Sequence, residues 1–216
     1  MKRKIIIILL VVLVVIAGLI FSIRPVEKFS EDTVETVSLK EILQKELLDS
    51  IAGMIINSSK ELQFELSEED INRLIAGKAD SKLKNMNIDS IHCIIHNGQA
   101  YFYADLKVLS LIPTQLFIKT NLTVEDNELK VAVEKAYVGR VPISKSFVLG
   151  VFQEKYDRWA IDSSSSTISI PIDLPKSLSI KELEVSDRIY FKLNISIKSA
   201  GDLLELLEYF GEKILN

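Results

Sequence analysis

The chain has 216 residues, of which 48% are hydrophobic and 26% are charged, and it contains a single cysteine. This length suits one domain with an attachment, and the composition excludes a disordered or collagen-like chain. One cysteine excludes an internal disulfide and a zinc site built on several cysteines. All 30 acidic residues lie from Glu27 onward, so nucleic acid is not an expected partner, because affinity for phosphate backbones rests on clustered Lys and Arg.

The N-terminal segment 5–23 is apolar throughout and carries no charged side chain. Its length approaches the ~20 residues with which a helix crosses the hydrocarbon core of a bilayer. Lys2, Arg3 and Lys4 precede the segment and only Arg24 directly follows it, so the positive-inside rule places the N-terminus in the cytoplasm. The sequence therefore predicts an N-terminal transmembrane anchor over 1–24 and a single-pass protein of the cell membrane.

A cleaved signal peptide is the alternative interpretation of the same segment. The apolar region of a signal peptide usually has ~7–15 residues and ends in small residues of the A-x-A kind. The run here is longer, and residues 21–25 offer no such site, so an uncleaved anchor is preferred. A polar extracytoplasmic tether is then predicted over 25–37, followed by one extracytoplasmic domain over 38–216.

The domain begins with a predicted helix. A capping-box pattern at Ser38 and Glu41, followed by apolar residues at helical spacing, predicts a long amphipathic helix over about 39–56. Residues 61–66 alternate in polarity as a short strand does. Ser67 and the acidic residues after it predict the start of a short helix that Gly77 ends.

From Met86 to Gly139 the apolar period changes to two, which predicts an antiparallel meander with one buried face and a hairpin turn at Asn97 and Gly98. A second amphipathic helix is predicted after Ser144, and strands over 168–172, 181–185 and 189–197 precede a C-terminal helix. The apolar side of the second helix is predicted to carry Phe147, Val148, Val151, Phe152, Tyr156 and Trp159.

The order of these elements predicts an α+β fold. The helices supply more apolar side chains than are needed to cover a flat sheet. We therefore expect a curved antiparallel β-sheet wrapped around the long amphipathic helix, with further helices, preceded by the single transmembrane helix.

The sequence offers no set of catalytic or metal-binding residues. His92 and His96 would share one face of a strand too far apart to chelate one ion, and Cys93 has the apolar environment of a core residue. The pattern S-x-x-K at Ser81 has no companion motif, and no nucleophile elbow, P-loop or dinucleotide fingerprint is present. No enzyme activity, cofactor or metal is predicted. An enzymatic role would gain support if a histidine lay beside a carboxylate and a serine in a cleft.

Two interpretations remain open for Tyr101 and Tyr103, which lie on the strand face opposite Phe102. They could line a ligand site, or they could be exposed strand tyrosines, because aromatic side chains suit a pleated surface.

The quantity of apolar surface in long elements predicts an acyl-chain site, since such pockets are mostly apolar with few polar groups. The same side chains could also fill a dry core. The candidate lipid-binding groove residues are Leu43, Leu47, Ile51, Phe102, Leu106, Val148, Phe152, Trp159 and Phe191.

The layout of the chain resembles the YpmS-like family of single-span proteins of Gram-positive bacteria. The resemblance rests on the apolar run 5–23, on residues 64–75 with the sequence FELSEEDINRLI, and on residues 137–143 with the sequence YVGRVPI. The pattern is also similar to that of small bacterial TULIP (BPI-like) proteins, in which a curved sheet wraps a long helix and holds lipid in an apolar groove.

This resemblance implies a membrane-anchored, extracytoplasmic lipid-binding or lipid-transfer protein without catalysis. Its partner would be a lipid or a lipid-linked envelope intermediate. The alternative is a non-catalytic cell-envelope scaffold with a filled core, which docks onto another envelope protein through an exposed helix or sheet edge.

Overall fold

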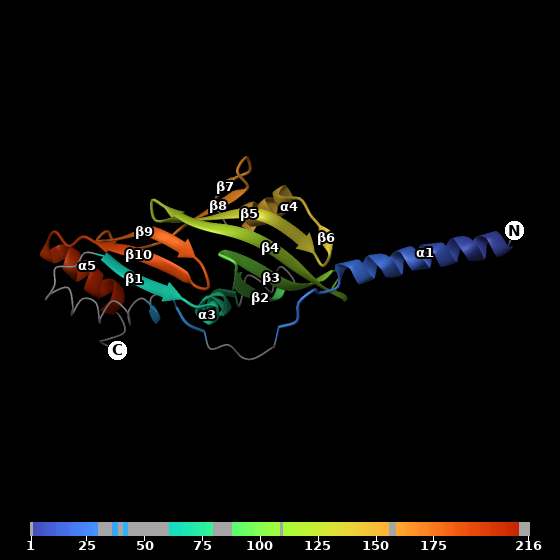
Figure 1. Cartoon of the computed structure of the whole chain (residues 1–216), viewed down its shortest axis with the longest axis horizontal. Helices are drawn as coiled ribbons and strands as arrows, with labels where there is room; N and C mark the ends of the chain where they lie inside the picture. Colours follow the sequence, from blue (N-terminus) through green and yellow to red (C-terminus); the bar gives the residue numbers. More distant parts are fainter. Residues whose placement is uncertain are drawn as a thin grey trace.

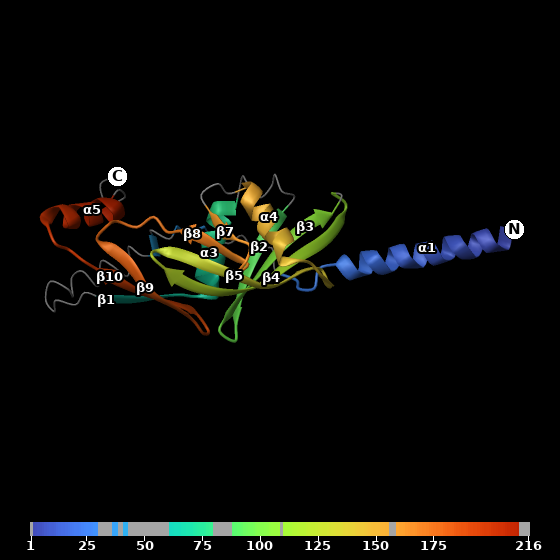
Figure 2. The same cartoon turned by 90° about the horizontal axis from the view of Figure 1, so that it is seen from above.

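The computed structural model describes residues 2–29, 36–38, 41–42, 61–79, 88–108, 110–155 and 159–211. Figures 1 and 2 show an elongated molecule in which α1 projects from one end and α5 lies at the other. In chain order the elements are α1 (Lys2–Ile23), β1 (Glu61–Leu66), α3 (Glu68–Ala79), β2 (Ile88–His96), β3 (Gln99–Val108), β4 (Ile112–Glu125), β5 (Glu128–Val138), β6 (Val141–Pro142), α4 (Lys145–Lys155), β7 (Ala160–Asp162), β8 (Thr167–Pro171), β9 (Leu178–Val185), β10 (Ile189–Ile195) and α5 (Ala200–Gly211).

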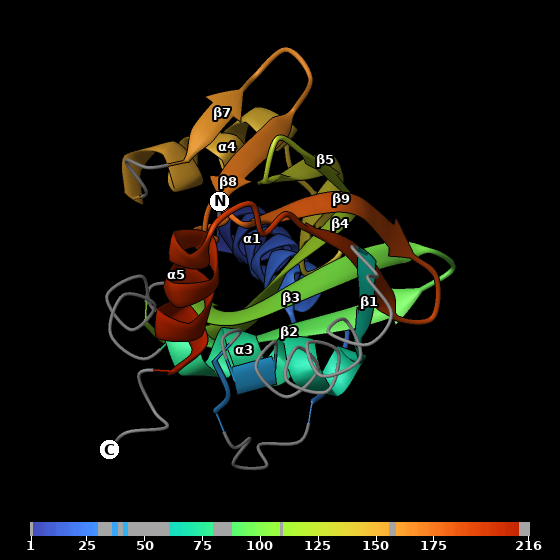
Figure 3. The same ribbon diagram turned by 90° about the vertical axis from the view of Figure 1, so that its left-hand side faces the viewer.

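The strands form two antiparallel sheets. The larger has the order β2-β3-β4-β5-β8-β7, with β6 paired to β5, and the smaller has the order β1-β10-β9. The end-on view in Figure 3 shows β9 of the smaller sheet lying against β4 of the larger one. The predicted meander and its hairpin at Asn97 and Gly98 are confirmed, since both residues have positive φ angles and join β2 to β3.

The predicted fold class is wrong. The described chain is mostly β and forms two sheets, rather than an α+β domain with one curved sheet around a long helix. The physical reason is that β10 pairs with β9 on one side and with β1 on the other, which forms a second sheet. β1 and β10 lie far apart in the chain, so local periodicity does not reveal their pairing. The predicted helix over 39–56 lies largely outside the described residues. Its capping box is present, with Glu41 N donating to Ser38 Oγ and Ser38 N donating to Glu41 Oε2.

The prediction of a transmembrane helix also needs correction. α1 is helical over Lys2–Ile23. In the part of the chain that the structure describes, no helix is both long enough and apolar enough to cross a membrane.

The C-terminal end of α1 is bound to the end of the larger sheet. Arg140 donates to two of its last carbonyl oxygens, from N to Ser22 O at 2.8 Å and from NH1 to Phe21 O at 3.2 Å. Thr114 Oγ1 donates to Ile23 O. Gly139 has a φ of 58°, and a Cβ added there would lie 2.5 Å from the Ile23 carbonyl carbon. The last carbonyl oxygens of a helix have no partner within the helix. Here Arg140 and Thr114 supply hydrogen-bond donors to three of them.

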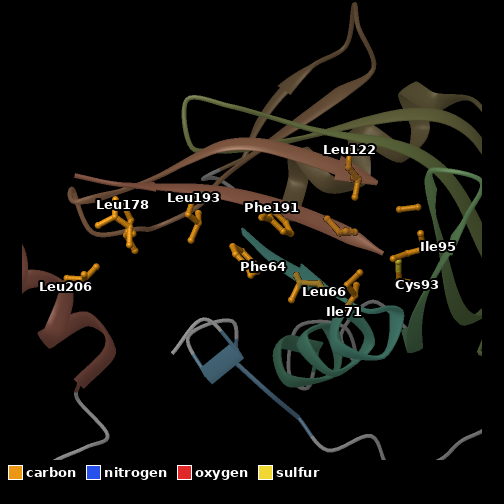
Figure 4. Close-up of a cluster of buried hydrophobic side chains, with 13 residues drawn as sticks. Phe64, Leu66, Ile71, Cys93, Ile95, Leu122, Leu178, Phe191, Leu193 and Leu206 are labelled. Atoms are coloured by element: carbon orange, nitrogen blue, oxygen red, sulfur yellow. The ribbon is translucent and has the colours of Figure 1, made fainter. Parts of the chain in front are cut away.

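The apolar core consists of two clusters on the inner face of the sheets. The first lies between the two sheets, α3 and α5, and the second lies beneath α4. Figure 4 shows the first cluster as a file of side chains from Leu206 on α5 to Cys93 and Ile95 on β2. At its centre the rings of Phe64 and Phe191 are stacked 4.9 Å apart.

Helix α3 covers the edge strand β2 with its side chains. Asn72 Oδ1 accepts a hydrogen bond from Cys93 N at 2.6 Å, and Asn72 Nδ2 donates to Cys93 O at 3.0 Å. Glu68 Oε2 accepts from Ile95 N at 3.1 Å. The helix begins at Ser67 as predicted, where Asp70 N donates to Ser67 Oγ. The amide of Asn72 thereby replaces the neighbouring strand that an edge lacks.

We predict that Asn72→Ala lowers the free energy of unfolding by about 1–3 kcal/mol, because it leaves both backbone groups of Cys93 without a partner. Urea denaturation of the full chain measures this loss. Glu69→Ala on the exposed side of α3 is the matched control and should change stability little. Equal stability of Asn72→Ala and the unchanged chain would contradict this role of Asn72.

Candidate functional site

The predicted groove residues are divided between the two clusters. Phe191 belongs to the first cluster and Phe102 packs against it, whereas Val148 belongs to the second cluster, against which Phe152 and Trp159 pack. Leu106 is half-buried and belongs to neither. Leu43, Leu47 and Ile51 lie outside the described residues.

The second cluster differs from the prediction in two details. α4 ends at Lys155, so Trp159 follows the helix instead of lying on it, although its ring still lies 5.6 Å from that of Phe152. Phe147, predicted on the apolar side, is 62% exposed, whereas Val148 is 2% exposed. The face of α4 that packs on the sheet therefore includes Val148 but not Phe147.

Val131 of β5 joins the two clusters. It is half-buried and packs against both of them, so that apolar contacts continue from the first cluster to the second along the inner face of the larger sheet. The alternating pattern placed Val131 on the buried face but gave no sign that it links two clusters, because its partner strand β8 comes from a distant part of the chain.

The outer face of the larger sheet carries an aromatic row, which is formed by His92, Tyr103, Phe117 and Tyr137. These residues are direct cross-strand partners on β2, β3, β4 and β5. The ring centroids of Tyr103 and Phe117 lie 5.0 Å apart, and those of Phe117 and Tyr137 lie 5.7 Å apart. Tyr101 extends the row sideways at 5.9 Å from Phe117. All five side chains are half-buried, so part of each ring is accessible.

The chain after α1 crosses one end of this row. The ring of Phe29 is stacked on His92 at 4.2 Å and tilted against Tyr103 at 5.3 Å. Gln115 Oε1 accepts hydrogen bonds from the backbone nitrogens of Val26 and Glu27, which holds this segment on the sheet. Part of the segment predicted as a tether is therefore bound to the domain.

Polar groups border the row on both of its sides along the strands. On one side, Asp105 accepts hydrogen bonds from Ser90 Oγ at 2.8 Å and from Gln115 Nε2 at 2.9 Å. On the other side, Glu134 pairs with Lys119 at 3.0 Å and accepts a hydrogen bond from Gln99 at 3.0 Å. The hydrogen bond from Lys119 is the main reason why the pKa of Glu134 is lowered.

The grouping of His92, Ser90 and Asp105 bears on the enzymatic interpretation. In a hydrolase triad one imidazole nitrogen takes the serine proton while the other donates to the carboxylate. Here His92 Nε2 alone faces both partners, at 3.2 Å from Ser90 Oγ and 4.0 Å from Asp105 Oδ2, and Ser90 donates its proton to Asp105. This arrangement does not prepare Ser90 as a nucleophile.

Cys93 lies on the inner face and is 0% exposed. Burial, assisted by the nearby charge of Glu68, raises the pKa of its thiol to about 12. The prediction of a core cysteine is confirmed. Within the described parts of the chain, no group of three or more His, Cys, Asp or Glu side chains is arranged to hold a metal ion.

We predict that His92 makes stability depend on pH. Burial lowers the pKa of His92, although Asp105 partly opposes this, so the unfolded chain binds a proton more readily than the folded one. The stabilising contribution is present above the unfolded pKa of about 6.5 and is lost as the pH falls through that value toward the lower folded pKa.

Urea denaturation at a series of pH values between about 7.5 and 5 measures this effect around the unperturbed histidine pKa. His92→Phe keeps a ring against Phe29 and should show a smaller loss of stability on acidification than the unchanged chain. His96→Phe, on the exposed end of β2, is the control and should keep the original slope. An unchanged slope in His92→Phe would contradict the assignment.

Comparison of the chain with known protein families, with curated proteins and with solved structures found no match. The resemblance to the YpmS-like family and to the TULIP proteins therefore stays a prediction.

Proposed function

We propose that the protein binds lipid acyl chains along the inner face of its two sheets and catalyses no reaction. The observation that supports this proposal is the file of apolar side chains in Figure 4, which runs from Leu206 to Cys93 and continues through Val131 to the cluster beneath α4. A long, narrow apolar track suits an extended hydrocarbon chain. Each Å² of apolar surface removed from water would contribute about 25 cal/mol to binding.

A place at the outer surface of the cell membrane is part of the proposal. The residues of α1 from Leu10 to Leu19, and Phe21, are exposed around the helix, with Leu13 61% and Phe21 60% exposed. Exposed apolar surface of this extent is typical of segments that contact lipid or another protein. Because the sheet holds the end of α1, the inner face would stand at a fixed position relative to any lipid that α1 bound.

A photoreactive palmitate analogue tests the proposal. The full chain in detergent micelles is irradiated with the probe, and the labelled peptides are identified by mass spectrometry. We expect labels on inner-face residues of both clusters, including Phe102 and Phe152, because the acyl chain would lie between them. Unlabelled palmitate in excess should remove these labels.

Labels on α1 are expected whether or not the domain binds lipid, since α1 is exposed and apolar. They therefore serve as the internal control for probe delivery. Labelling confined to α1, with none on the inner face, would contradict the lipid-binding proposal.

The alternative role, a scaffold of the cell envelope with a filled core, is favoured by one observation. Phe64 and Phe191 are stacked 4.9 Å apart, and Leu206 is 0% exposed, so side chains meet one another directly at these points of the first cluster. Labelling confined to α1 would leave this role as the better description.

A further inference from the structure

The proposed lipid site uses the inner face of the sheets and leaves the aromatic row on the outer face without a role. We propose that this row is a binding site for saccharide, and specifically for an extended β-1,4-linked glycan. The row crosses β2, β3, β4 and β5 as direct cross-strand partners, so the positions of its rings are fixed by backbone pairing rather than by flexible loops. A site on strands holds its rings in place before the ligand arrives.

The rings match the apolar part of a sugar. One face of a pyranose in a β-1,4-linked chain presents C–H groups, which pack against the negative face of an aromatic ring. The centroids of Tyr101 and Phe117 lie 5.9 Å apart with their planes at 21°, and those of Phe117 and Tyr137 lie 5.7 Å apart at 42°. These separations are near the spacing of successive sugar rings in an extended chain.

The chain itself covers one end of the row with a ring. Phe29 is stacked on His92 with an angle of 12° between the ring planes and also contacts Tyr103. This contact occupies the β2 end of the row. The glycan would therefore lie over Tyr101, Phe117 and Tyr137, whereas the ring contacts of Phe29 are with His92 and Tyr103.

Hydroxyl groups of the glycan would find partners at the borders of the row. Asp105 lies at one border, and Gln99 and Glu134 lie at the other. Carboxylates and amides accept or donate two or more hydrogen bonds each, which suits the neighbouring hydroxyls of a sugar. The hydroxyl of Tyr137 makes no hydrogen bond to another described residue and is not buried, so it can also bind the ligand.

Other ligands fit this surface less well. An acyl chain would displace water from the charged borders without offering them any hydrogen bond in return, which costs free energy. Nucleic acid would place phosphates near the carboxylates of Asp105 and Glu134 on a chain with a formal net charge of −4. A neutral glycan has neither disadvantage.

Saturation-transfer NMR with the tetramer of β-1,4-linked N-acetylglucosamine tests the proposal on the full chain in detergent micelles. Saturation of the protein should transfer to the ring C–H protons of the sugar, because these protons would face the aromatic row. Titration then gives a dissociation constant. Maltotetraose, whose α-1,4 linkages bend the chain, should bind at least several-fold more weakly.

Variants assign the binding to the row. Tyr137→Ala and Tyr101→Ala should each weaken binding about tenfold, since each removes one stacking surface. Tyr137→Phe keeps the ring and should retain most of the affinity. Tyr190→Ala is the matched control, because Tyr190 is a half-buried tyrosine on β10 of the smaller sheet, away from the row.

Urea denaturation of each variant shows whether it is folded, and the use of two alanine variants and one phenylalanine variant keeps the test valid if one of them is unstable. Absence of saturable binding to the tetramer would overturn the proposal. So would equal affinity of Tyr137→Ala, Tyr101→Ala and Tyr190→Ala, or equal affinity for maltotetraose. None of these outcomes would affect the lipid proposal, which concerns the opposite face.

Discussion

The register of β2, β3, β4 and β5 is the constraint on which both faces of the larger sheet depend. Successive side chains of a strand point to opposite faces, so Phe102 lies on the inner face while its neighbours Tyr101 and Tyr103 lie on the outer one. A slip of one residue in any pairing would exchange the faces of that strand. It would bury tyrosine and histidine among apolar side chains and break the aromatic row.

Two turns fix this register and also connect the two sheets. At the β2–β3 turn, Gly98 N donates to Ser186 O of the β9–β10 turn, and a Cβ on Gly98 would lie 3.2 Å from a backbone oxygen of β9. At the β4–β5 turn, Asp126 and Asn127 both have positive φ angles, and Asn127 Oδ1 accepts a hydrogen bond from Ile180 N of β9 at 2.7 Å. The turns that align the strands therefore also hold the smaller sheet over the inner face.

Local features of the fold could be predicted from the sequence. The alternation in β2–β5, the hairpin signal at Asn97 and Gly98, and the helix start at Ser67 each depend on neighbouring residues, and each is present. Burial of Cys93 followed from its apolar neighbours on the same strand face.

Features that depend on distant segments could not be predicted. The pairing of β1 with β10 joins residues such as Phe64 and Phe191, and nothing in either segment specifies the other. The short strand β7 was missed because three residues carry no readable period. The aromatic row required the register of four strands, since Tyr103, Phe117 and Tyr137 are adjacent only after pairing. Sequence reasoning reached only Tyr101 and Tyr103.

The most direct test of this division into two faces is hydroxyl-radical footprinting of the folded full chain, read out residue by residue by mass spectrometry. We predict ready oxidation of Phe117 and Tyr137 on the outer face and protection of Phe64 and Phe191 on the inner face until urea unfolds the chain. Oxidation of the inner phenylalanines at the rate of the outer rings would contradict the register and, with it, both binding surfaces.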